Sequence, residues 1–574
     1  MRQIIFLVLI MDKITLKKDE VIAVNMFTAD MENMIRSLSD VLIEIFNAFK
    51  NGECGEHVKD ITLKLFNEWL TRSLLPTVEE AKKVMASTIE KAGDVDTAQK
   101  LLRKKLPTFK NIDKIVAEIM ADSKRGNLLE KVVSTHIWTL YSQQTEAFCV
   151  QTAHLIVGRL LMLHVGVDKG AWKPLTVQNN LPTPYLTFYW TSRSALSEFL
   201  PTIYNLNELD WLYIPDTIKQ GLEKMELSTL KFYEEKLDKY IARTDATLTK
   251  YDYSLVDVDL WKAVYQRFLP REEINKLGFV TTPDEIVDLI LDLIGYKENV
   301  QGLCNKSLLD PACGSGTFLV EALLRLKKHF ELDLPCHKRK QDSPTWIFEK
   351  NFLERVMLNI NGIDIHPFAT FLTTLNLTFQ LIDVYSLVKH KYPDFSLSFN
   401  IVTHDALVSK PKIREIGAYL NSRLKEASQR SRKYAQLCDR KFDFVVGNPP
   451  WGAVLRGNIG PLGSDEKRKY YKKHFKSAIG KYDIFVLFLE RGVEWLKDKG
   501  ILGMITQVTY VSQAFGKGIQ NVIKKTAALK YFIDLSKLGH IIFPGWTNYP
   551  AITVLQKGER QREIILVEVV ENEP

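Results

Sequence analysis

The segment Asn448-Pro449-Pro450-Trp451, directly after the apolar run 442–446, combines residue types that can grip a planar amine. Prolines have no backbone N–H, so the carbonyl groups of this turn remain available as acceptors, and Asn448 adds a side-chain oxygen. Acceptors on both N–H bonds of a conjugated amine localise its lone pair for attack on a methyl sulfonium, while Trp451 offers a flat stacking face. A proline turn packed by a tryptophan is the structural alternative for these residues.

A second polar turn lies upstream, in Asp310-Pro311-Ala312-Cys313-Gly314-Ser315-Gly316, between an apolar run and a helix expected to end near residue 328. Glycines let a backbone approach a ligand closely, and a helix N-terminus offers free N–H groups. The third glycine of the dinucleotide fingerprint is missing, which disfavours NAD and FAD. A turn of this kind occurs at nucleotide sites and also as a plain packing turn.

Two further acids follow later apolar runs: Asp364, which precedes Ile365, and Asp405, which precedes Ala406. A carboxylate after the second strand of an α/β sheet can accept from both ribose hydroxyls, and one after the third can accept from an exocyclic amine. Either aspartate alone is equally explained as a turn or helix cap. The two aspartates together, in this order after the glycine turn, predict a site that binds adenosine.

These polar residues require strands that end at one edge of a sheet. Short apolar runs alternate with helical stretches from residue 278 onward, and they predict seven strands, at 307–309, 361–365, 399–403, 442–446, 501–506, 531–535 and 551–555. We therefore expect an α/β fold with a mostly parallel, doubly wound, Rossmann-like sheet over 266–574. Helical periodicity, as over 128–159, predicts a mainly helical N-terminal domain over 1–265.

At this point the chain resembles the gamma-class DNA adenine-N6 methyltransferases of restriction-modification systems, of the type I modification-subunit or type II G-like kind. The resemblance rests on residues 310–319, Asp-Pro-Ala-Cys-Gly-Ser-Gly-Thr-Phe-Leu, followed by Asn-Pro-Pro-Trp at 448–451. Segments 278–287, 482–485, 496–500 and 542–544 resemble further family motifs in the family's order. The resemblance covers about residues 245 to 560.

The resemblance implies transfer of a methyl group from S-adenosylmethionine to the N6 amine of an adenine rotated out of duplex DNA. It places the catalytic role on Asn448, Pro449, Pro450 and Trp451. The residues implied in cofactor binding are Thr282, Pro283, Asp310, Pro311, Ala312, Gly314, Gly316, Asp364, Ile365, Asp405 and Ala406. Among them, Thr282 and Pro283 cover the methionine end, Asp364 binds the ribose and Asp405 the adenine amine. Phe543 is implied to contact the flipped adenine.

The charge of the chain is concentrated near the proline turn. The 574 residues carry a net charge of +8, whereas residues 410–481 alone carry 18 lysines and arginines against six acids, a net +12. Lys467, Arg468, Lys469, Lys472 and Lys473 alternate with aromatic residues just after Trp451. A solvated helix face is the usual explanation for such a run. Next to a catalytic turn we expect contacts to DNA phosphates instead.

The composition favours a soluble, cytoplasmic protein. Six cysteines without a CxxC pair disfavour both a disulfide framework and a zinc site, so we expect no metal. The apolar run 4–11 lacks a signal-peptide cleavage site and is interpreted as a buried strand or as sequence upstream of a start at Met11. The apolar run 155–165 is interrupted by Arg159, and a membrane span needs about 18 apolar residues.

The chain departs from the family in one respect: only about 14 residues follow the segment 556–559, too few for the target-recognition domain that the family normally carries there. We expect DNA recognition to come from a separate specificity or restriction subunit, from a lost carboxyl-terminal half, or from the helical domain. Methylation of a protein glutamine or an RNA guanine, and an inactive truncated subunit, remain alternatives. A nuclease site built from Asp216 and Glu234-Glu235-Lys236 is disfavoured, because residues 222–240 are predicted to be helical.

Overall fold

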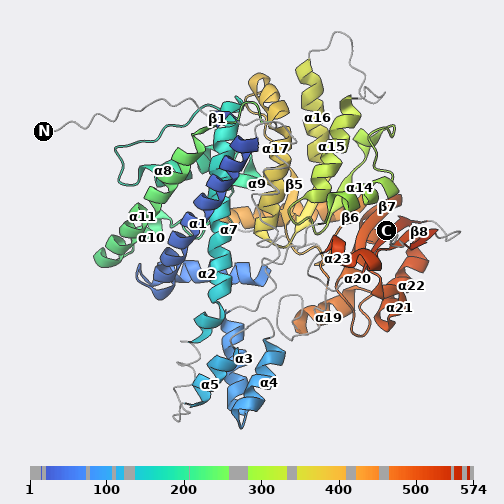
Figure 1. The fold of residues 1–574 in the computed structure, drawn as a ribbon, viewed down its shortest axis with the longest axis horizontal. Helices are drawn as coiled ribbons and strands as arrows, with labels where there is room; N and C mark the ends of the chain where they lie inside the picture. Colours follow the sequence, from blue (N-terminus) through green and yellow to red (C-terminus); the bar gives the residue numbers. More distant parts are fainter. Residues whose placement is uncertain are drawn as a thin grey trace.

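The computed structural model describes residues 14–15, 21–72, 78–106, 112–121, 136–205, 207–256, 282–331, 345–408, 422–451, 465–543, 549–558 and 565–568. The apolar run 4–11 lies outside these residues. Figure 1 shows a helical part, coloured blue to green, beside an α/β part, coloured yellow to red.

The N-terminal part is mainly helical, as the sequence predicts. Its described helices are α1 (Val21–Asn51), α2 (Glu56–Arg72), α3 (Val78–Lys91), α4 (Val95–Lys105), α5 (Ile112–Ala121), α7 (Ser142–Asp168), α8 (Pro184–Leu196), α9 (Pro201–Tyr204), α10 (Asp216–Lys219) and α11 (Lys224–Leu248). Two short strands, β1 (Ile14–Thr15) and β2 (Tyr251–Asp252), pair in parallel. In Figure 1, α3 to α5 form a small lobe apart from the longer helices.

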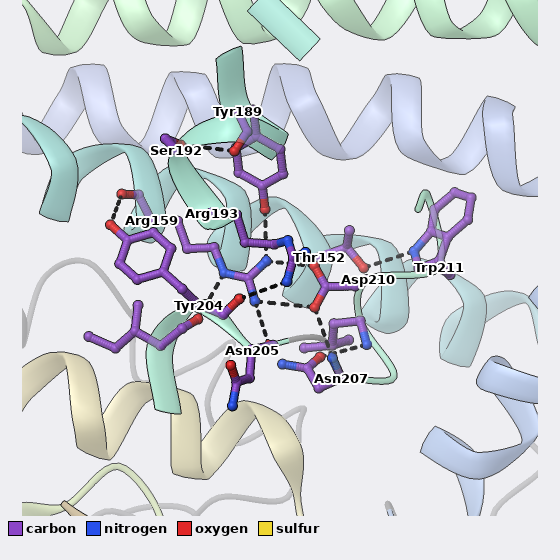
Figure 2. Close-up of polar contacts among 12 residues, drawn as sticks. Thr152, Arg159, Tyr189, Ser192, Arg193, Tyr204, Asn205, Asn207, Asp210 and Trp211 are labelled. Atoms are coloured by element: carbon purple, nitrogen blue, oxygen red, sulfur yellow. Dashed lines mark hydrogen bonds and ion pairs between the residues drawn. The ribbon is translucent and has the colours of Figure 1, made fainter. Parts of the chain in front are cut away.

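A buried ionic network holds the middle of this helical part together (Figure 2). The Arg159 guanidinium, 1% exposed, lies 2.5 Å from the Asp210 carboxylate, which is equally buried. Arg159 also donates to the Tyr189 hydroxyl and to the backbone carbonyls of Ile203 and Asn205. Burial alone would lower the pKa of the Arg159 guanidinium. The attraction of the Asp210 carboxylate and the hydrogen bonds exceed this effect, so the pKa is raised. The residue that interrupts the apolar run therefore anchors α7 to α8, α9 and the 205–211 loop.

All seven predicted strands lie in one sheet, and an eighth joins it at an edge. The strands are β3 (Leu308–Asp310), β4 (Ile360–Asp364), β5 (Asn400–Thr403), β6 (Phe442–Gly447), β7 (Leu496–Gln507), β8 (Ala527–Asp534), β9 (Pro550–Lys557) and β10 (Ile565–Glu568). Their order is β10-β8-β9-β7-β6-β3-β4-β5. The sheet is parallel except for β9, which runs antiparallel to both neighbours. The edge strand β10 has only four residues and was not predicted.

Helices cover both faces of the sheet, which makes it doubly wound. They are α14 (Asp284–Leu293), α15 (Thr317–Glu331), α16 (Thr345–Asn359), α17 (Pro367–Lys391), α18 (Ser422–Asp439), α19 (Asp465–His474), α20 (Phe485–Trp495), α21 (Thr509–Ser512), α22 (Lys517–Thr526) and α23 (Gly539–Ile542). Successive strand residues alternate between the faces: Leu308 and Val446 join one buried cluster, and Leu309 and Val445 join the other.

Helix α17 joins the two parts of the molecule. A Cβ atom on Gly158 of α7 would lie 3.0 Å from the Phe371 ring of α17, so glycine permits this close helix packing. By length and composition α7 and α17 could each cross a membrane, but 89% and 83% of their most apolar stretches are buried inside the fold. Both therefore serve as core helices here.

One buried apolar cluster runs from the N-terminal helices through α17 to the sheet. The predicted boundary between residues 265 and 266 falls in 257–281, which the structure does not describe. The division into 1–265 and 266–574 therefore stays a prediction, while the described residues on either side share a core.

Candidate active site

The predicted polar residues meet at one edge of the sheet. Because β6, β3, β4 and β5 are parallel neighbours, their carboxyl ends place Asn448, Asp310, Asp364 and Asp405 in a row in that order. Neighbouring strands are about 4.8 Å apart, so the row spans roughly 14 Å. Such a row suits an elongated ligand that lies across the strand ends.

The glycine turn after β3 is fixed from below by α17. The Thr373 hydroxyl donates to the Gly314 carbonyl over 2.8 Å, and the Asn376 amide donates to the Ser315 carbonyl over 3.0 Å. A Cβ atom on Gly316 (φ +92°) would lie 3.0 Å from Thr373, whereas no atom lies within 4 Å of the corresponding position on Gly314 (φ +53°). One glycine packs on α17, and the other leaves open space for a ligand.

Asp364 is held by backbone N–H groups. Its carboxylate accepts from Gly314 N over 2.9 Å and from His366 N over 2.8 Å, and its side chain is partly exposed. Burial raises the pKa of Asp364 to about 6, although the backbone hydrogen bonds oppose this shift. The next residue, Ile365, accepts from Arg72 of α2 through its carbonyl over 3.3 Å. The helical part of the molecule thus reaches the predicted ribose loop.

Asp310 links the glycine turn to the proline turn. Its side chain is 1% exposed and accepts from Ala312 N over 3.0 Å. Burial, with a smaller effect of the nearby Asp364 charge, raises the pKa of Asp310 to about 8, so the carboxyl is largely protonated at neutral pH. Gly447 (φ +151°) packs against it, because a Cβ atom there would lie 2.6 Å from Asp310 Oδ1. Only glycine lets the residue before Asn448 approach so closely.

The loop that carries Asp405 is fixed by hydrogen bonds to its carbonyl groups. Arg491 of α20 donates to the carbonyls of Ala406 and Val408, over 3.3 and 3.1 Å. The Tyr434 hydroxyl donates to Val408 over 2.6 Å, and Asp405 itself accepts from Leu407 N over 2.9 Å. The Asp405 side chain remains partly exposed.

The structure brings two predicted base-binding residues together. The rings of Trp451 and Phe543 meet edge to face, with centroids 5.0 Å apart and an interplanar angle of 83°. Phe543 is 2% exposed, whereas Trp451, Asn448 and Pro450 are partly exposed and Pro449 is buried. The Trp451 indole N–H is buried and has no hydrogen-bond partner among the described residues. Phe543 therefore supports the tryptophan from behind.

Thr282 and Pro283 come just before α14, which runs antiparallel to the strands. Arg325 of α15 binds Asp288 and Asp292 of α14 and the carbonyl of Tyr296. The Tyr296 ring contacts Phe444 near the amino end of β6. The C-terminus of α14 thus lies toward the amino ends of the strands, and its N-terminus lies toward the carboxyl edge. This orientation suits the predicted role of the Thr-Pro pair.

The predicted basic residues lie on α19. Lys469, Lys472 and Lys473 are exposed, and Lys467 and Arg468 lie in its first turn, where side chains are not described. The C-terminal end of α19 is anchored by the buried Glu490 carboxylate, which accepts from the backbone N–H groups of residues 476 and 477 over 2.9 and 2.7 Å. The exposed lysines therefore project from a firmly held helix.

The residues considered for a nuclease site do not lie on strands. Asp216 begins α10, and Glu234, Glu235 and Lys236 lie on α11. Glu234 pairs with Lys219, and Lys236 with Glu44. The helical prediction for this segment is confirmed, and these ion pairs explain its charges.

Comparison with known proteins agrees with this arrangement. Residues 358–541, which include Asp364, Asp405 and the Asn448 turn, match the Eco57I restriction-modification methylase family. Over this segment the chain is similar to that family. The family's methyl donor is S-adenosylmethionine, and the open space at Gly314 and the row of carboxyl groups fit a nucleoside of this kind.

Three relatives are 23–27% identical to this chain. The type II methyltransferase M.BstVI of Geobacillus stearothermophilus is 27% identical over 50% of this chain and 43% of its own length. The methylase subunit of the type I restriction enzyme MjaVII of Methanocaldococcus jannaschii is 23% identical over 60% and 57%. The adenine-specific methyltransferase PglX of Streptomyces coelicolor is 23% identical over 45% and 22%. The chain thus spans about half or less of the length of these relatives.

Sequence reasoning missed the residues that position the site. Thr373 and Asn376 fix the glycine turn, Gly447 abuts Asp310, and Arg72 comes from a distant helix. A signal existed for the first two, because they are polar residues in a helix that is otherwise buried and apolar. No local signal marks Arg72, since its contact joins residues 293 positions apart.

Proposed function

We propose that this chain transfers a methyl group from S-adenosylmethionine to the N6 amine of adenine in duplex DNA, after rotation of the base out of the helix. The observation that carries the proposal is the Asn-Pro-Pro-Trp turn at the end of β6, adjacent to the glycine turn of β3 through the contact of Gly447 with Asp310. Adenine as the target is supported by the similarity to PglX, an adenine-specific methyltransferase.

The row of carboxyl groups would hold the cofactor, which supplies an electrophilic methyl group when bound. Asp364, ionised above pH about 6, accepts from the ribose hydroxyls, and Asp405 accepts from the adenine amine. The turn 311–316, with its open space at Gly314, and the start of α15 lie beside the ligand, next to Ile365 and Ala406. Thr282 and Pro283 cover the methionine end.

The proline turn would orient the target amine. The Asn448 side-chain oxygen and the Pro449 carbonyl accept its two N–H bonds, which localises the nitrogen lone pair toward the methyl group. Trp451, supported by Phe543, stacks on the base. No base needs to remove a proton before attack, because the amine becomes acidic only after it is methylated.

DNA would approach along α19, where the exposed lysines contact phosphates near the flipped base. We propose that the chain works in the cytoplasm within a restriction-modification system and assembles with a specificity or restriction subunit. The similarity to the MjaVII methylase subunit supports a role as part of a larger enzyme.

The test is a methyl-transfer assay with labelled S-adenosylmethionine and duplex DNA of varied sequence, with and without candidate partner subunits. The wild-type chain should produce N6-methyladenine in at least one combination. Asn448→Ala should reduce transfer by about 100- to 1,000-fold, the usual effect of removing an oriented polar group, with cofactor affinity unchanged. Glu234→Gln, on the distant helix α11, is the control and should transfer normally.

Two results would contradict the proposal. Equal transfer by Asn448→Ala and the wild type would remove the assigned role of the turn. Methylation of RNA or protein, with DNA unmodified in every combination, would favour the alternative substrates.

A further inference from the structure

Two stretches of the chain near the proline turn contain basic residues and no acidic ones. Seven lysines and arginines and no aspartate or glutamate occur between residues 467 and 482, which include most of α19. Four lysines and no acidic residue occur between residues 507 and 533, which include α21 and α22. Helix α20 and strand β7 separate the two stretches in the sequence. If the fold brings the stretches together, they form one basic surface.

A close backbone contact does bring them together. A Cβ atom on Gly518 of α22 would lie 2.9 Å from the Cα atom and the carbonyl oxygen of Ser477, so glycine permits this approach. Lys476 and Lys517 are the chain neighbours of these two residues, and their Cα atoms therefore lie within about 12 Å of each other. Both side chains are exposed, as is that of Lys481. We call Lys476, Lys481 and Lys517 the basic junction.

Hydrogen bonds hold the backbone of the basic junction in place. On one side, the buried Glu490 carboxylate of α20 accepts from the two backbone N–H groups at 476–477, over 2.9 and 2.7 Å. On the other side, the Gln520 amide of α22 donates to two carbonyl groups of α21, over 2.9 and 3.0 Å. Helices α19 to α22 also contribute side chains to one buried cluster, and they lie in the orange-to-red part of Figure 1. The three lysines thus project from a fixed surface.

The basic junction lies at the same edge of the sheet as the proline turn. Strands β6 and β7 are parallel, with Gly447 opposite Met504, so the end of β7 and the Asn448 turn share the carboxyl edge. Helix α22 begins at Lys517 shortly after that end. It finishes directly before β8, which runs in the direction of β7 because both are antiparallel to β9. Lys525 therefore lies near the opposite edge of the sheet.

The charges of the basic junction are not neutralised by neighbouring side chains. Among the residues whose side chains the structure describes, Lys476, Lys481 and Lys517 have no acidic partner. The helical part of the molecule shows the contrast, because there Lys219 pairs with Glu234 and Lys236 pairs with Glu44. Three exposed cations without acidic partners favour a negatively charged ligand at this surface.

We propose that the basic junction binds the phosphate backbone of duplex DNA. This inference rests on the proposed function and deepens it, because it gives the path of the duplex on the protein. Duplex DNA carries one negative charge per about 1.7 Å of its axis, which matches a row of exposed lysines. The duplex then extends from the proline turn and α19 across the start of α22, a helix that packs on β8. Contacts to phosphates fix the register of the duplex without reading its sequence.

The test measures the binding of a fluorescein-labelled DNA duplex of arbitrary sequence by anisotropy, over a range of salt concentrations. The full chain is used, with and without candidate partner subunits. Each phosphate contact contributes about 0.9 to the slope of log Kd against log salt concentration. Lys517→Gln should reduce this slope by about 1 and weaken binding about five- to tenfold at about 0.1 M salt. The triple variant Lys476→Gln, Lys481→Gln, Lys517→Gln should reduce the slope by about 2 to 3.

Three controls separate a phosphate contact from other effects. Lys525→Gln removes the same charge from the same helix about 12 Å farther along and should keep the wild-type slope. Lys517→Arg keeps the charge and should bind DNA within about twofold of the wild type. Lys517→Gln should bind S-adenosylhomocysteine and unfold as the wild type does, because the side chain has no acidic partner among the described side chains.

The outcomes distinguish the inference from the proposed function. If the wild type binds no duplex DNA in any combination, the proposed function fails, and the inference fails with it. If the wild type binds DNA but Lys517→Gln and the triple variant keep its affinity and slope, only the inference is wrong. An equal loss in Lys525→Gln would also overturn it, because net charge rather than position would explain the effect. A triple variant that binds DNA normally but no longer assembles with a partner subunit would assign the surface to that partner.

Discussion

The molecule contains two groups of ionisable side chains that differ in whether a side chain of opposite charge accompanies them. In the helical part, Arg159 and Asp210 neutralise each other, and the surrounding hydroxyl and carbonyl groups complete their hydrogen bonds (Figure 2). At the sheet edge, Asp310 and Asp364 form no ion pair with a lysine or arginine within the described ranges. Backbone N–H groups of Ala312, Gly314 and His366 donate to these two carboxyl groups instead.

The difference agrees with a structural role for the Arg159 pair and with the ligand-binding role that we propose for Asp310 and Asp364. The pKa of Arg159 is raised, so the guanidinium is stably charged and needs nothing more. The pKa values of Asp310 and Asp364 are raised to about 8 and 6, which means that folding disfavours their charged forms. The charged form of such a carboxyl group is stabilised by a ligand whose hydroxyl or amine groups donate hydrogen bonds to it. Raised pKa values at the carboxyl ends of parallel strands support the binding site that we propose there.

The largest effect should come from breaking the neutral pair. Asp210→Asn keeps the shape of the side chain but leaves the Arg159 charge buried without its counterion. We expect the free energy of unfolding to fall by about 3–5 kcal/mol, measured by chemical denaturation. The control is Glu234→Gln, which breaks the more exposed pair with Lys219 and should cost at most about 1 kcal/mol. Similar losses in both variants would show that burial of the Arg159 pair has no special importance.

A smaller effect, on binding, should follow from the unpaired carboxylate. If ionised Asp364 accepts from the ribose, affinity for S-adenosylhomocysteine should weaken as the pH falls through about 6. Asp364→Asn should bind about 10- to 100-fold more weakly at pH 8, the range for hydrogen bonds to a charged group, and should show little change between pH 8 and 5. Calorimetry between pH 5 and 8 measures the affinity of the wild type and of the variant.

The stability of the ligand-free protein provides the matching check. The pKa of Asp364 is higher in the folded state, at about 6, than its ordinary value of 3.8, so wild-type stability at this residue decreases as the pH rises from 4 to above 6. Asp364→Asn removes this loss. The stability of the variant relative to the wild type should therefore be greater at pH 8 than at pH 4, whatever the cost of replacing one carboxylate oxygen that accepts from a backbone N–H. A stability difference that is independent of pH would contradict the raised pKa.

The same comparison explains what could be predicted from the sequence. The carboxylates at strand ends were predictable, because a parallel sheet brings the ends of separate apolar runs to one edge. The paired network was not: Arg159 was interpreted only as an interruption of an apolar run, since its partners lie 30 to 51 residues away. Local sequence patterns reveal turns and the periodicity of apolar residues. The partner of a buried charge, in contrast, depends on tertiary packing.

The antiparallel strand β9 and the edge strand β10 illustrate a second limit. An apolar run predicted β9 as a strand. The direction of β9 depends on the two strands between which it inserts, β7 and β8, and a local run does not reveal them. Phe543 reaches Trp451 because the chain returns to the edge of the sheet between β8 and β9. The prediction of this residue depended on resemblance to a family, because its spacing along the chain carries no such information.

The smallest effect should come from the hydrogen bond between Arg72 of α2 and the predicted ribose loop. Arg72 donates to the Ile365 carbonyl over 3.3 Å and pairs with the buried Glu208 at 3.0 Å. Arg72→Lys can keep the ion pair, but it loses the planar fork that reaches both groups. We expect S-adenosylhomocysteine to bind about two- to threefold more weakly, since the lost hydrogen bond is long. Arg103→Lys, whose partner Asp113 is exposed, should bind as the wild type does. Unchanged binding by Arg72→Lys would limit α2 to a structural role and leave the orientation of the ribose loop to the sheet and α17.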